Sequence, residues 1–117
     1  MELIKSCIKA VNSANAKDIK IYETKTINPL FDYAIIATVS TNRQLNAVIS
    51  HAEDEAAKKG FQIRGVEGRG GGCWLLVDLY SCVIHVFTEE EREHYNLDKL
   101  WNNLTEISVE EVLNNEL

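Results

Sequence analysis

A carboxylate and an imidazole, Asp78 and His85, lie within the run CWLLVDLYSCVIHVF of residues 73–87. If this run turns back at Tyr80-Ser81, both side chains point to one face of a hairpin and Leu76 lies opposite His85. Such a pair can act as an acid and a base, or as two ligands of a metal ion. No third ligand or activated nucleophile accompanies it, which favours a structural or interface role for His85. Asp78 contacts either a partner or the amides of the turn.

The predicted hairpin has two unlike faces. One face is apolar throughout and consists of Leu75, Val77, Leu79, Cys82, Ile84 and Val86. The other, which we call the mixed face, consists of Trp74, Leu76, Asp78, Val83, His85 and Phe87. A plain core would not select this mixture of aromatic and ionisable side chains. We therefore expect the apolar face to build the fold and the mixed face to contact a partner.

Two neighbouring runs suggest chemistry but have simpler interpretations. The glycine-rich residues 68–72 resemble a phosphate loop, yet they lead into a strand and lack a Gly-Lys-Ser/Thr ending. They are predicted to form a flexible connection, with Arg69 as a mobile contact. The acidic residues 89–93 are typical of a solvated helix start. Arg92, Tyr95 and Trp101 carry large side chains that can anchor against the mixed face or a partner, although Trp101 fits a core position better.

The composition indicates one globular domain. The chain has 117 residues, 45% of them hydrophobic, which is enough to bury a core without metal or disulfide. No apolar run approaches the ~20 residues that cross a bilayer, and residues 1–17 have helical spacing rather than the apolar block of a signal peptide. The three cysteines, Cys7, Cys73 and Cys82, contain no CxxC pair and are expected to be small buried hydrophobes. These features predict a cytoplasmic protein.

The net charge of −6 limits the class of partner. A protein that binds bare nucleic acid carries a stripe of basic residues that neutralises phosphates, and this sequence has no such stripe. An acidic chain is better matched to a basic protein surface.

The order of the predicted elements favours an α/β fold. Helices are expected at 2–14, 42–59, 89–95 and 97–101, and strands at 18–23, 31–39, 61–67 and in the hairpin. Side chains at 40–42 and Gly60 would cap the second helix, which should connect parallel strands. The sequence thus predicts a mixed sheet of about five strands with flanking helices. Residues after 102 form either a weak last helix or a frayed end.

The ordered set of these residues resembles the ribosomal silencing factor family, also called Iojap-like, over residues 1–104. Residues 105–117 then form an acidic C-terminal tail. The resemblance rests on Asp32-Tyr33, Ser40, Asn42-Arg43-Gln44, Val66-Glu67-Gly68, Trp74, Leu76, Asp78, His85, Phe87, Glu91-Arg92, Tyr95, Leu97 and Leu100-Trp101.

The resemblance implies an α/β domain with nucleotidyltransferase-like topology but without the active site. It implies binding to the large ribosomal subunit through ribosomal protein uL14, which blocks joining of the small subunit and represses translation when nutrients are scarce. No catalysis, cofactor, metal, membrane or sequence-specific nucleic acid is expected. The interface residues it implies are Trp74, Leu76, Asp78 and His85, with Arg43 and Tyr95 at the periphery.

Two departures and two alternatives accompany this interpretation. Family members often have a Gly-Asp type turn where this chain has Tyr80-Ser81, and the run Gly70 to Gly72 is richer in glycine than usual. The first alternative is a nucleotidyltransferase-like or metal-dependent enzyme. The second is a homodimer that pairs the mixed faces of two copies.

Overall fold

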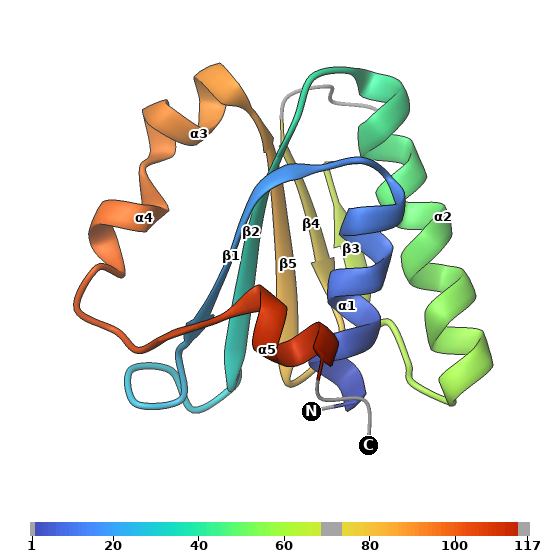
Figure 1. Ribbon diagram of the computed structural model, residues 1–117, viewed down its shortest axis with the longest axis horizontal. Coiled ribbons are helices and arrows are strands. Elements are labelled where there is room, and N and C mark those ends of the chain that lie inside the picture. The colour runs from blue at the N-terminus through green and yellow to red at the C-terminus, as the bar shows by residue number, and fades with distance from the viewer. Residues whose placement is uncertain (1, 69–73, 115–117) are drawn as a thin grey trace.

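A computed structural model describes residues 2–68 and 74–114 of the chain and has a six-stranded sheet at its centre (Figure 1). The strand order is β3-β4-β5-β2-β1-β6, and the central pair β2 and β5 is parallel while the other neighbours are antiparallel. The elements are α1 Glu2–Ser13, β1 Lys17–Glu23, β2 Tyr33–Val39, α2 Asn42–Lys59, β3 Gly65–Glu67, β4 Trp74–Asp78, β5 Cys82–Thr88, α3 Glu89–Tyr95, α4 Leu97–Leu100, β6 Glu106–Ile107 and α5 Val109–Asn114.

The predicted α/β fold is confirmed, with six strands instead of about five. The additional strand, β6, has only two residues and therefore shows no alternation in the sequence. The strand predicted at 61–67 is shorter than expected. The Phe61 amide donates to the carbonyl of Ala56 and prolongs the end of α2, so pairing with β4 starts only at Gly65.

The helices form two unlike layers on the sheet. α1 and α2 lie together on one side, whereas α3 and α4 lie on the other (Figure 1). The caps predicted for α2 are present: Thr41 and Gln44 form a capping box, and Gly60 ends the helix at φ 78°. α2 connects β2 to β3, which run in the same direction, as the sequence predicted.

The main core lies between the sheet and the layer of α1 and α2. All six residues of the predicted apolar face belong to it, and none is more than 4% exposed. Cys7 and Cys82 are buried free thiols within this core, as expected, and Cys73 lies outside the described residues. A hydrogen bond with Cys7, together with burial, raises the pKa of the Cys82 thiol.

The chain beyond residue 104 returns to the body of the domain. β6 pairs with β1, and α5 packs against α1 with Val112 only 2% exposed. Within residues 2–68 and 74–114, no helix is long and apolar enough to span a membrane.

The hairpin has the predicted register. Leu76 lies opposite His85, and the Leu79 amide donates to the Cys82 carbonyl across a turn formed by Tyr80 and Ser81. Tyr80 has φ +72°, in the left-handed region that favours glycine. The entry to the hairpin is also tight, because a Cβ at Gly68 would lie 2.2 Å from the carbonyl oxygen of Trp74. Arg69 and the glycines at 70–72 lie outside the described residues.

Candidate functional site

The mixed face lies on the side of the sheet opposite α1 and α2, and the chain itself covers part of it. Phe87 joins Tyr22 and Ile36 in a second, smaller core, against which Trp74, Leu97, Trp101 and Leu104 pack. Phe87 and Val83 are buried, whereas Trp74, Leu76, Asp78 and His85 are half-buried. The half-buried residues are therefore the part of the mixed face that a partner can reach.

Aromatic rings from α3, β4 and β5, and from the residue that follows α4, form a row across this face. The ring centroids of Tyr95 and Trp74 are 5.9 Å apart, and those of His85 and Trp101 are also 5.9 Å apart. The centroids of Trp74 and His85 are 6.5 Å apart, and these two rings are nearly parallel. We call Tyr95, Trp74, His85 and Trp101 the aromatic row. Tyr95, at the end of α3, is 53% exposed.

His85 is held in its neutral form. Burial lowers the pKa of its imidazole to about 4, and its Nδ1 atom is buried with no hydrogen-bond partner among the described residues. Asp78 does not pair with it, because Asp78 lies opposite Val83 in the hairpin register. The acid/base pair considered from the sequence is therefore not assembled. Among the described residues, no group of three His, Cys, Asp or Glu side chains could hold a metal ion.

Asp78 is engaged within the chain. Arg64 donates to its two carboxylate oxygens at 3.0 and 3.3 Å, and the Tyr80 amide donates to Oδ1 at 2.9 Å. The Arg64 guanidinium also lies 4.7 Å from the centroid of the Tyr80 ring and 5.8 Å from that of Phe31. The carboxylate thus accepts a hydrogen bond from a backbone amide of the turn, which is one of the two roles that the sequence left open.

Of the predicted interface residues, the structure brings Trp74, Leu76, His85 and Tyr95 together. Asp78 lies at the far end of β4 from Trp74. Arg43 is the second residue of α2 and is exposed, on the helix that covers the opposite face of the sheet.

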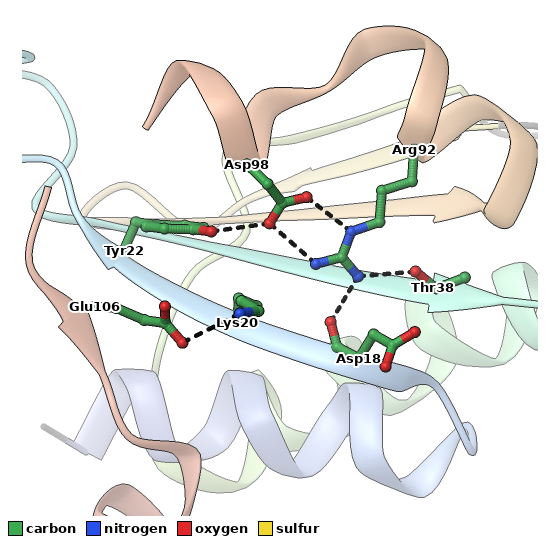
Figure 2. Close-up of polar contacts among 7 residues, drawn as sticks. All are labelled: Asp18, Lys20, Tyr22, Thr38, Arg92, Asp98 and Glu106. Atoms are coloured by element: carbon green, nitrogen blue, oxygen red, sulfur yellow. Dashed lines mark hydrogen bonds and ion pairs between the residues drawn. The ribbon is translucent and has the colours of Figure 1, made fainter. Parts of the chain in front are cut away.

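A polar network fastens α3 and α4 to the sheet (Figure 2). Arg92 pairs with both oxygens of Asp98 at 2.9 and 3.1 Å and donates to Thr38 Oγ1 at 2.8 Å and to the Asp18 carbonyl at 2.6 Å. The Tyr22 hydroxyl donates to Asp98 Oδ1 at 2.8 Å. Burial alone would raise the pKa of Asp98, but hydrogen bonds from Arg92 and Tyr22 outweigh it and lower that pKa. The network positions α4 and, one residue beyond it, Trp101.

A pocket of about 300 Å³ opens beside the aromatic row. Ala34, Leu76 and His85 contribute to its sheet side, and Trp101 and the β1–β2 loop at Ile27 line it as well. This loop lies between the strands predicted at 18–23 and 31–39, and the sequence pattern predicted no site there. The sequence contained a signal for a site here, because Ile27 and Leu30 are large aliphatic residues on either side of Asn28-Pro29. In the structure these two side chains are 58% and 68% exposed.

Comparisons with known proteins agree on one family. The family model described as ribosomal silencing factor during starvation matches residues 1–116. A ribosomal silencing factor of Bacillus subtilis is 34% identical over 99 residues, which cover 85% of this chain and 84% of that protein. A mouse protein named for mitochondrial assembly of the ribosomal large subunit is 30% identical over 80% of this chain and 42% of its own length.

A solved structure supports the same assignment. A crystal structure of a protein from Chromobacterium violaceum superposes with a TM-score of 0.82 at 34% identity, covering 86% of this chain and 84% of that one. With a family model that matches nearly the whole sequence and a solved relative of the same fold, the chain belongs to the ribosomal silencing factor family.

Proposed function

We propose that this protein binds the large ribosomal subunit through ribosomal protein uL14, blocks joining of the small subunit sterically and represses translation in the cytoplasm when nutrients are limiting. The family is one of ribosomal silencing factors, and the mouse relative is named for assembly of a ribosomal large subunit. The observation that carries the proposal is the aromatic row, which stays accessible on a sheet face whose opposite side already forms the core.

The aromatic row has the properties of a binding centre. Trp74 and His85 are half-buried and held in place by their neighbours, so little side-chain freedom is lost when a partner covers them. Tyr95 offers a larger exposed area at one end of the row. Fixed aromatic side chains of this kind dominate the energetics of protein interfaces.

The charge of the surrounding surface favours a basic partner. The chain carries a net charge of −6, and Glu89, Glu90 and Glu93 are exposed on α3, the helix that ends at Tyr95. A basic ribosomal protein is complementary to this surface, and the attraction speeds encounter more than it strengthens the final complex.

Asp78 and Arg43 belong to the margins of the proposed interface. Asp78 accepts three hydrogen bonds within the chain, and a carboxylate has about four acceptor sites, so one more donor can be accommodated. Arg43 would reach a partner only where that partner extends past the end of the sheet to α2.

A titration of subunit joining tests the proposal. Inhibition by steric occupancy should rise with the ratio of protein to large subunits and saturate near one to one, without progressing after binding has equilibrated. Large subunits mixed with small subunits before the protein is added should be protected. Progressive inactivation by substoichiometric protein, or a requirement for magnesium and a nucleotide, would replace the proposal with the enzymatic alternative.

Co-sedimentation with purified large subunits tests the interface. Trp74→Ala should weaken binding by about 2 kcal/mol, roughly 30-fold, as expected for a truncated aromatic hot spot. Phe61→Ala removes another half-buried aromatic side chain, in the connection after α2, and serves as the control. Equal binding by the two variants would reject the mixed face as the interface.

A further inference from the structure

We propose that the pocket beside the aromatic row receives one uncharged, apolar side chain from the basic protein partner. The inference rests on the proposed function, because His85 and Leu76 belong to both the predicted interface and the pocket. It adds a specific contact that the aromatic row alone does not define.

The pocket has room for a side chain. Its volume of about 300 Å³ is at the lower end of the range for ligand sites. Ala34, at 3% exposed, is the smallest residue of the lining, and its position on β2 is opposite Val83 of β5, which also lines the pocket. Trp101 closes the pocket on the side of α4.

The lining is mostly apolar, and the side-chain oxygens of Thr24 and Asn28 already take part in hydrogen bonds within the chain, which argues for an apolar occupant. Thr24 Oγ1 donates to the Phe31 carbonyl at 3.2 Å, and Asn28 Oδ1 accepts from the Leu30 amide at 2.9 Å. No Lys, Arg, Asp or Glu is among the lining residues, and burial keeps His85 neutral at physiological pH. A charged group entering this pocket would lose its hydration without gaining a counterion.

The surroundings favour a protein over a free small molecule. Ile27 is part of the lining yet 58% exposed, and the neighbouring Leu30 is 68% exposed. A ligand confined to the pocket would leave both side chains in water, whereas a protein surface that inserts a side chain also covers the rim. The exposed glutamates of α3 lie at the other end of the sheet from the pocket, so they favour basic residues elsewhere on the same partner surface.

Filling the pocket from inside tests the inference. Ala34→Leu adds three carbon atoms to a side chain that lines the pocket, and it should weaken binding to purified large subunits at least tenfold. Because the contact is apolar, the loss should persist when the salt concentration is raised. Ile27→Asn removes the apolar rim from an exposed position, so it reports on binding even if Ala34→Leu disturbs folding. Leu100→Asn is the matched control, since Leu100 is 69% exposed and does not line the pocket.

The outcomes separate this inference from the proposed function. Weak binding by Ala34→Leu and Ile27→Asn, with normal binding by Leu100→Asn, supports a side chain in the pocket. Normal binding by both pocket variants, while Trp74→Ala binds weakly, overturns the pocket contact and leaves the proposed function intact. If Ala34→Leu changes only the self-association seen by analytical ultracentrifugation, the occupant is a second copy and the inference is wrong. Failure of the wild-type protein to bind large subunits rejects the proposed function itself.

Discussion

The two faces of the sheet are built on different physical principles. On the core face, α1 and α2 bury apolar stripes against strand residues such as Ile35 and Ile84, both at 0% exposure. On the mixed face, neither α3 nor α4 contains a fully buried residue, and Arg92 and Asp98 fasten them through hydrogen bonds. The core face therefore supplies most of the stability, which leaves the mixed face free to hold partly exposed aromatic side chains.

Truncation of one aliphatic residue on each face should give the largest contrast. Ile84→Ala leaves a cavity in the core and should cost about 3 kcal/mol of unfolding free energy. Leu76→Ala removes a half-buried side chain and should cost about 1 kcal/mol, while weakening large-subunit binding. Urea denaturation measures the first quantity and co-sedimentation the second. Equal losses of stability would contradict the division of labour between the faces.

The pH dependence of the unfolding free energy should reveal the contribution of His85, on the mixed face. Its pKa is about 4 in the folded protein against 6.5 for an exposed histidine, so as the pH falls below 6.5 the unfolded chain takes up the proton first. The stability contributed by the neutral imidazole is complete above pH 6.5 and is lost toward pH 4, by about 3 kcal/mol at most. His85→Phe keeps a ring in the row and should abolish this loss. Urea unfolding at pH 7 and pH 5 would measure it, and an unchanged pH dependence would disprove the assignment.

Removal of the Arg92 guanidinium should loosen the cover of the mixed face. Arg92→Met leaves the half-buried Asp98 without its charged donor and should cost about 2 kcal/mol of unfolding free energy at pH 7. Because the pKa of Asp98 lies below its usual 3.8, the stability from this ion pair is present above that pH and is lost as the pH falls further. The acid-induced loss should therefore be smaller in the variant.

Arg64→Met provides the control for the Arg92 prediction. It breaks an arginine–aspartate pair whose guanidinium side chain is 40% exposed, so it should cost at most about 1 kcal/mol. If the two arginine variants lose equal stability in denaturation, the network in Figure 2 has no special role in fastening α3 and α4.

The smallest effect is expected in the hairpin turn, which both faces share. Tyr80→Gly relieves a side chain at φ +72° but loses the stacking of Tyr80 with Arg64 and makes the unfolded chain more flexible. The gain and the two losses are each about 1 kcal/mol and partly cancel, so the net loss of stability should be about 1 kcal/mol and the melting temperature should fall by only a few degrees. A large destabilisation would show that the Arg64–Tyr80 contact dominates the turn.

Local patterns in the sequence predicted the elements and the two faces, because alternation along residues 74–87 determines which side chains lie together. The register that places Leu76 opposite His85 followed from the turn position alone. The packing of α3 and α4 over the mixed face could not be predicted from the sequence. It depends on the contact of Tyr22 with Asp98, 76 positions apart, and no periodicity reveals such a pair. The engagement of Asp78 by Arg64 was missed for the same reason.

The lengths of the outermost strands bear on how copies of the protein meet at high concentration. β3 has three residues and β6 has two, so each outermost strand offers few backbone groups for strand addition by another chain. Templated aggregation along a sheet border is accordingly disfavoured. A dimer that forms face to face over the mixed face would use the same aromatic side chains that we assign to the ribosomal partner. Self-association and ribosome binding would then be mutually exclusive, and a concentrated pool of the protein would be its own competitor.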